Sequence, residues 1–130
     1  MKRGLVISII DDDESVRIAT RSLLRSLGFT AHTFACAEDF LASDSVTKSS
    51  CVITDIQMPG LSGVELQRRL IAQGNNTPII FITAFPDDVT RARVLEAGAI
   101  CLLTKPFDGE RLIQCLDKAV KQRDGAGFDP

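Results

Sequence analysis

Five short apolar runs alternate with helical stretches along the chain. The runs lie at residues 5–10, 30–34, 51–54, 78–83 and 99–104. The run at 30–34 is a weaker strand candidate, whereas those at 51–54 and 78–83 suit strands buried on both faces. Apolar spacing and cap residues predict helices from Val16 to Leu27 before Gly28, over 37–42, from Ser62 to Gly74, from Pro86 to about Gly98 and from Leu112 to Val120. This alternation predicts a doubly wound α/β fold, in which helices cover both faces of a five-stranded parallel sheet.

The composition is that of one globular domain. The 130 residues are 45% hydrophobic and 25% charged, and a chain of this length can bury a single core. The N-terminus MKRGLV lacks the apolar segment of a secretory signal, and the longest apolar runs are too short to span a bilayer, so we expect a cytoplasmic location and no membrane partner. The net charge of −2 gives no general attraction to DNA, so any nucleic-acid role requires another domain.

The cysteines form no recognisable metal or redox motif. They are Cys36, Cys51, Cys101 and Cys115. No two of them form a C-x-x-C pair, and none has the spacing to His32, the single histidine, that would indicate a zinc site. We expect all four to be small buried hydrophobic residues and His32 to be structural.

Acidic residues follow the first and third predicted strands. The run IIDDDE ends the first strand, and Asp55 directly follows the third. If these strands are neighbours, Asp11, Asp12 and Asp55 converge at one edge of the sheet. Two carboxylates about 4 Å apart repel by roughly 4 kcal/mol at an effective dielectric constant of about 20, so the cluster requires a cation or raised pKa values. Oxygen ligands without Cys or His favour Mg²⁺, although one acid, Asp13, is expected to cap the following helix.

Four motifs, each at a predicted strand end, give the chain a family resemblance. They are IIDDDE, TDIQMPGLSG, FITAF and LLTKPF. With them the chain resembles a two-component response-regulator receiver domain from about residue 5 to residue 120, and its details are similar to receivers of LuxR- and FixJ-type regulators. The resemblance implies a flavodoxin-like (βα)5 fold with strand order 2-1-3-4-5. We expect a receiver domain over 1–123 and a flexible tail or the start of a linker over 124–130.

The resemblance also implies the roles of the acidic residues. Asp55 matches the phosphoacceptor, which would take a phosphoryl group from a phosphohistidine of a sensor histidine kinase or a histidine phosphotransfer protein. Asp11 and Asp12 match the pair that binds Mg²⁺ together with Asp55, and the backbone carbonyl of Gln57 matches a further metal ligand. Such a domain catalyses only its own phosphorylation and dephosphorylation, and is a signalling domain rather than an enzyme.

Thr83 and Lys105 complete the predicted site. Phosphoryl transfer spreads negative charge over the phosphoryl oxygens, so the site must supply donors and positive charge. Thr83 ends the fourth strand and Lys105 follows the fifth, and both are expected to reach across the edge toward Asp55. Taken alone, either residue has a structural reading, as a strand-end threonine or a solvated turn lysine. The family often has a cis peptide before the proline that matches Pro106.

Two positions depart from the family pattern. Leu102 stands where many relatives have an aromatic residue that moves inward after phosphorylation, so the usual ring-based read-out cannot be carried over. Gln57 and Phe85 stand two positions after Asp55 and Thr83, where the family's residues flank the path of attacking water. Our hypothesis is that Phe85 restricts this water and lengthens the life of the phosphorylated form.

Several alternatives stay open from the sequence. A haloacid-dehalogenase phosphatase also uses a strand-end aspartate, but it has a second aspartate where Gln57 stands here. A pseudo-receiver would only bind a partner. Arg17, Arg21 and Arg25 form a column on the first helix that is either a kinase-docking face or a solvated basic face. DNA contact would need an output domain absent from this chain, and a phosphorylation-dependent homodimer is also left open.

Overall fold

The computed structural model describes residues 5–127 and shows one parallel sheet of five strands. The strands are β1 (Val6–Ile10), β2 (Thr30–Phe34), β3 (Cys51–Asp55), β4 (Ile79–Thr83) and β5 (Cys101–Thr104). Their order is β2-β1-β3-β4-β5 and all four pairings are parallel, which confirms the expected doubly wound topology. The central strands β3 and β4 are buried along their whole length, as their continuous apolar sequences predict.

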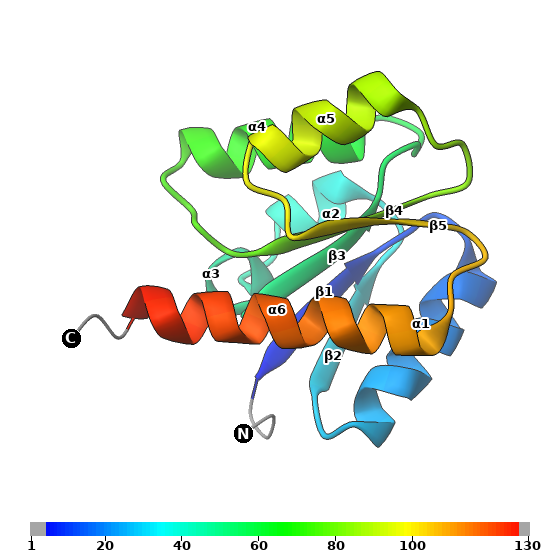
Figure 1. Ribbon diagram of the computed structural model, residues 1–130, viewed down its shortest axis with the longest axis vertical. Coiled ribbons are helices and arrows are strands. Elements are labelled where there is room, and N and C mark those ends of the chain that lie inside the picture. The colour runs from blue at the N-terminus through cyan, green and yellow to red at the C-terminus, as the bar shows by residue number, and fades with distance from the viewer. Residues whose placement is uncertain (1–4, 128–130) are drawn as a thin grey trace.

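Six helices cover the two faces of this sheet (Figure 1). They are α1 (Glu14–Ser26), α2 (Ala37–Leu41), α3 (Ser45–Lys48), α4 (Gly63–Ala72), α5 (Asp88–Glu96) and α6 (Gly109–Gly127). Helices α1 and α6 pack on one face, and α2, α4 and α5 pack on the other. The carboxyl ends of the strands therefore open at one edge between the two helix layers, which we call the site rim.

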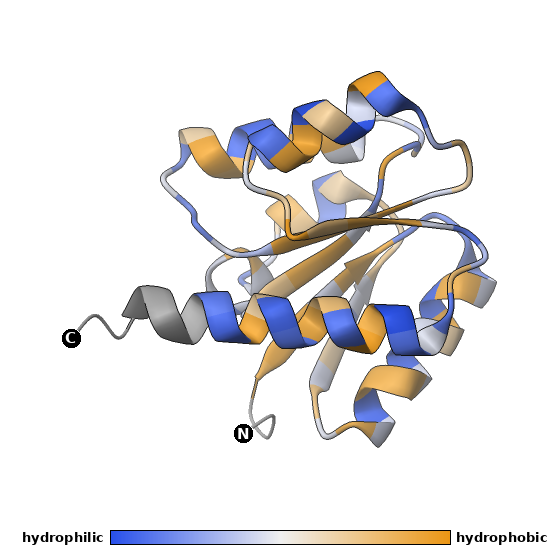
Figure 2. Ribbon diagram, viewed as in Figure 1, coloured by the Kyte–Doolittle hydropathy of each residue, from blue (hydrophilic) through white to orange (hydrophobic). Residues whose placement is uncertain are grey.

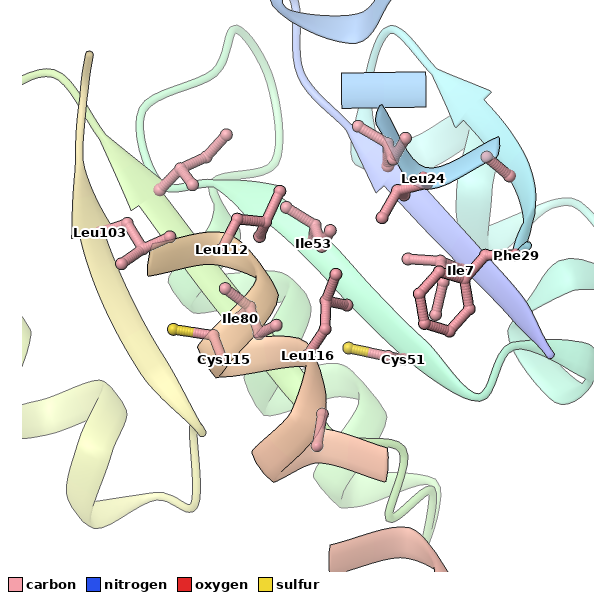
Figure 3. Packing of buried hydrophobic residues seen from close by; sticks show 14 residues of the cluster. Ile7, Leu24, Phe29, Cys51, Ile53, Ile80, Leu103, Leu112, Cys115 and Leu116 are labelled. Carbon is pink, nitrogen blue, oxygen red and sulfur yellow. The ribbon is translucent and has the colours of Figure 1, made fainter. Parts of the chain in front are cut away.

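The hydrophobic core is divided into two layers by the sheet. Successive strand residues point to opposite faces, so Ile53 packs in the layer under α1 and α6, whereas Val52 packs under α2 and α4. Leu112 and Leu116 of α6 lie over Ile80 and Ile53 in the first layer (Figure 3). The coloured part of helix α6 alternates hydrophobic and hydrophilic segments, as expected for a helix with one buried face (Figure 2).

Two local cap signals in the sequence are confirmed. Asp13 caps α1, since its side chain accepts hydrogen bonds from the backbone N–H groups of Ser15 and Val16. Ser62 and Glu65 form the expected capping box at the start of α4: the Ser62 hydroxyl accepts from the Glu65 N–H, and the Glu65 carboxylate accepts from the Ser62 N–H. These caps fix where the chain turns from each strand into the next helix.

Other element boundaries differ from the sequence prediction. Pro86 does not lie in the first turn of α5, because Asp87 caps that helix through its side chain and the helix begins at Asp88. The short helix α3 was not predicted, since four residues are too few to show a helical period. Helix α6 runs to Gly127 and so includes 124–127, which we expected to belong to a flexible tail or the start of a linker; residues 128–130 lie outside the described residues.

The prediction that all four cysteines are small buried hydrophobic residues is wrong for three of them. Cys101 of β5 and Cys115 of α6 form a disulfide with Cα atoms 6.3 Å apart. Cys36 is only half-buried, and Cys51 is buried and free. Burial raises the pKa of the Cys51 thiol to about 12, so this thiol is unreactive near neutral pH. The disulfide joins two elements whose proximity is a product of the fold, and so the sequence spacing did not reveal it.

The disulfide predicts a simple thiol count and a stability difference. After denaturation, the oxidised protein should expose two alkylatable thiols, those of Cys36 and Cys51, and four after reduction, as mass spectrometry can count. Reduction should lower the free energy of unfolding by about 3 kcal/mol, because a cross-link closing a loop of this size restricts the unfolded chain. Cys36→Ser is the control, and its stability should respond to reduction as the parent protein does. Four free thiols in the oxidised sample would contradict the assignment.

Candidate functional site

The three acids predicted to converge lie together at the site rim. Strands β1 and β3 are neighbours with Ile10 opposite Thr54, so the residues that follow these two positions meet at the rim. Carboxylate oxygens of Asp11, Asp12 and Asp55 all lie within 4.8 Å of one another. Asp11 is fully buried, Asp55 is 4% exposed and Asp12 is exposed. The cluster thus has a buried floor and one carboxylate facing solvent.

Lys105 contacts two of these three carboxylates. Its Nζ is 2.9 Å from Oδ2 of Asp55 and 2.9 Å from Oδ2 of Asp11. The Lys105 N–H donates to the Thr83 carbonyl at 2.8 Å, and the Lys105–Pro106 peptide is cis, as the resemblance implies. The lysine is therefore directed into the site and is not a solvated turn residue.

The electrostatics of the site show an excess of buried negative charge. Burial raises the pKa of Asp11 above its ordinary value, and hydrogen bonding from Asp13 and Lys105 only partly offsets this. Desolvation alone would lower the pKa of Lys105, but its contacts with Asp55 and Asp11 outweigh burial and raise that pKa. Because the pKa of Asp11 is higher in the folded state, folding stability falls as the pH rises through the titration of this carboxyl. A cation at the rim would reduce that cost.

One buried oxygen makes the cluster suitable for a metal ion. Oδ1 of Asp11 accepts the Asp13 N–H at 2.9 Å. Oδ2 of Asp11 forms the ion pair with Lys105 but has no hydrogen-bond partner among the described residues. Apart from this ion pair the buried oxygen has no partner in the described part of the chain, and a hard cation would satisfy its remaining lone pairs. The donor set therefore fits Mg²⁺.

Thr83 and Gln57 make a contact that the sequence did not predict. The Thr83 hydroxyl, expected to reach toward Asp55, donates to Oε1 of Gln57 at 2.7 Å and accepts the Phe85 N–H at 3.1 Å. The Gln57 N–H donates to Oδ1 of Asp55 at 3.3 Å. Gln57 therefore connects the phosphoacceptor candidate at the end of β3 with the hydroxyl at the end of β4.

Gly63 at the start of α4 and Glu38 of α2 shape the loop after β3, but neither was singled out from the sequence. The Gly63 N–H donates to the Ile56 carbonyl at 2.9 Å, and a Cβ at Gly63 would collide with the Asp55 carbonyl oxygen. Glu38 of α2 accepts the Leu61 N–H at 3.1 Å and so ties the loop to a neighbouring helix. A glycine directly after the capping serine was the available signal for Gly63, since glycine is unfavourable inside a helix.

The remaining predicted positions have mixed outcomes. Arg17 donates from Nη1 to the Asp11 carbonyl at 2.6 Å, so this arginine of the α1 column supports the rim, whereas Arg25 is exposed. Leu102 is buried in β5 and Phe85 is 72% exposed. His32 lies on the edge strand β2, where its Nδ1 is 3.1 Å from the Ser45 hydroxyl, which agrees with a structural role.

The fold and this rim identify the family of the chain. The family model of the response regulator receiver domain matches residues 7–117. The chain belongs to this family, and it is a receiver domain of two-component response regulators. Among the described residues, no helix combines the length and apolar character needed to cross a membrane.

Sequence and structure comparisons agree on this assignment. The chain is 39% identical over 119 residues to the response regulator protein TodT of Pseudomonas putida, covering 92% of this chain and 52% of that protein. It is 36% identical over 120 residues to the transcriptional regulatory protein FixJ of Bradyrhizobium diazoefficiens, covering 92% and 58%. The chain thus spans about half the length of these curated relatives.

Solved structures give the same picture. The response regulator StyR superposes with a TM-score of 0.88 and 39% identity, over 95% of this chain and 62% of that chain. The N-terminal part of FixJ superposes with a TM-score of 0.81 and 32% identity, over 92% of this chain and 95% of that chain. Both confirm the receiver fold.

Magnesium ions should stabilise the folded protein through the acidic cluster. At about ten times its Kd, a ligand bound only by the folded state raises the free energy of unfolding by roughly 1.4 kcal/mol, which thermal or urea unfolding can measure. Asp11→Asn should lose most of this increment because it removes one of the clustered carboxylates. Asp44→Asn removes an exposed carboxylate before α3 and should keep the increment. An equal increment in Asp11→Asn and the parent protein would contradict a site at the rim.

Proposed function

We propose that Asp55 accepts a phosphoryl group from a phosphohistidine of a sensor histidine kinase or a histidine phosphotransfer protein. A carboxylate oxygen of Asp55 attacks phosphorus, the P–N bond breaks, and the released imidazole nitrogen takes a proton from solvent. The observation that carries this proposal is the contact of Lys105 Nζ with Asp55 Oδ2 at 2.9 Å, at the open rim of the sheet. A cation there lies where negative charge develops during transfer.

The other residues have defined roles in this proposal. Lys105 exchanges part of its contact with the carboxylates for a phosphoryl oxygen, and the Thr83 hydroxyl donates to another. The ligands that would hold Mg²⁺ are the side chains of Asp11, Asp12 and Asp55 and the backbone carbonyl of Gln57. When bound, Mg²⁺ supplies positive charge to the phosphoryl oxygens. The domain thereby catalyses its own modification and has no separate substrate to turn over.

The proposal extends to the setting of the domain. Residues 1–123 form the receiver, and a linker begins from residue 124, within the last turn of α6. The family assignment and Gln57 at the second position after Asp55 argue against the haloacid-dehalogenase phosphatase. Phosphorylation changes the conformation of the rim and so controls an output. One such output is a homodimer that forms when the domain is phosphorylated. The similarity to the transcriptional regulatory protein FixJ supports contact with DNA through an output domain that is not part of the given sequence. The location that we propose for the protein is the cytoplasm.

Phosphorylation can be tested directly by intact-mass spectrometry. Acetyl phosphate with Mg²⁺ should add the mass of one phosphoryl group to the parent protein, and chelation of Mg²⁺ should prevent the addition. Asp55→Asn should abolish the addition because the amide nitrogen and oxygen cannot form the acyl phosphate. Asp44→Asn, a matched substitution away from the rim, should be phosphorylated normally. Phosphorylation that persists in Asp55→Asn would contradict the assignment of Asp55 as the phosphoacceptor.

The lifetime of the phosphorylated form provides a separate prediction. The Phe85 side chain is exposed, and the N–H of this residue donates to the Thr83 hydroxyl, so Phe85 lies beside the rim that water would approach. Phe85→Ala should speed dephosphorylation severalfold, and Phe85→Glu should also shorten the lifetime, as measured by loss of the phosphoryl mass over time. Val89→Ala, which truncates another exposed apolar side chain, is the control. Unchanged rates in both Phe85 variants would count against this hypothesis.

A further inference from the structure

The Thr83 hydroxyl already donates its only proton to another side chain in the structure. Thr83 is 1% exposed, so its hydroxyl cannot turn to bulk water. Its single proton is donated to Oε1 of Gln57 at 2.7 Å, and its oxygen accepts the Phe85 N–H at 3.1 Å. A hydroxyl has only one proton to donate, so the bond to Gln57 and a bond to a phosphoryl oxygen exclude each other.

The two partners of this bond differ in what they lose when it breaks. Gln57 is exposed, and its amide can exchange the threonine for water at little cost. Thr83 is buried and requires another acceptor if Gln57 leaves. The backbone of Gln57 is also held on the phosphoacceptor candidate, since its N–H donates to Oδ1 of Asp55 at 3.3 Å. The competing acceptor is thus tethered directly beside the place where the phosphoryl group would arrive.

We infer that the Gln57 side chain is a latch that holds the Thr83 hydroxyl in the unphosphorylated state. This inference rests on the proposed function, because it assigns Thr83 to the phosphoryl group of Asp55. Gln57 is a positioning residue: its side chain acts on the reaction only through Thr83. The latch opposes phosphorylation by the strength of one hydrogen bond, which the phosphoryl oxygen must replace.

The latch predicts that removing the Gln57 acceptor favours the phosphorylated conformation. Beryllofluoride with Mg²⁺ mimics the aspartyl phosphate and binds at equilibrium, so its affinity for the full chain can be measured by fluorine NMR. Gln57→Met keeps the side-chain length without the amide and should raise this affinity roughly two- to tenfold, the range expected for one net hydrogen bond. Gln57→Asn keeps an amide that is too short for the contact and should act in the same direction.

A double-mutant cycle separates the latch from a general structural effect. In a Thr83→Val background the hydroxyl is absent, so adding Gln57→Met should leave the beryllofluoride affinity unchanged. Gln73→Met, the same substitution at an exposed position after α4, should have no effect in either background. A structural role for Gln57 would alter the unfolding free energy without this dependence on Thr83.

The outcomes distinguish the latch from the function on which it rests. The latch is overturned if Gln57→Met leaves the affinity unchanged, or weakens it because the amide itself binds the phosphoryl group. It is also overturned if the gain persists without the Thr83 hydroxyl. The proposed function fails separately if the parent protein shows no Mg²⁺-dependent beryllofluoride binding, or if Asp55→Asn binds as the parent does; either result overturns the latch as well.

Discussion

The structure depends on one constraint at the site rim: two buried carboxylates share a single lysine. Asp11 and Asp55 both contact Lys105 Nζ at 2.9 Å, and the buried Oδ2 of Asp11 has no hydrogen bond among the described residues. Buried ion pairs are weak sources of stability because desolvation offsets the Coulombic gain. The surrounding fold must therefore hold this charge in place, and a cation bound at the rim would stabilise the site.

The sheet and its first loop supply that support. Parallel pairing of β1 with β3 sets the two acids side by side, and pairing of β4 with β5 sets Thr83 beside the strand that leads into Lys105. Gly63 lets α4 begin against the Asp55 backbone, where any larger residue would collide. The same buried strands that stabilise the core thus fix the geometry of the rim, so the site cannot be altered without cost to packing.

The route from the rim to the rest of the molecule differs from a ring-based switch. Leu102 is already buried in β5, whereas Thr83 is held by the side chain of Gln57, which follows the end of the neighbouring strand β3. A change at Asp55 would therefore be read first by the Thr83–Gln57 bond and by the chain at Phe85 that hydrogen-bonds to the same hydroxyl. The disulfide between Cys101 and Cys115 further ties β5 to α6.

The amino-acid sequence by itself determined the features that depend on local pattern. Alternating apolar runs specified the strands, Ser62 and Glu65 specified the start of α4, and strand-end acids specified the rim, because these signals act within a few residues or follow from parallel pairing. Tertiary structure alone decided the partner of the Thr83 hydroxyl, the Cys101–Cys115 bond and the close approach at Gly63. Each of these joins groups distant in the chain, and their contact depends on how helices and loops pack on the finished sheet.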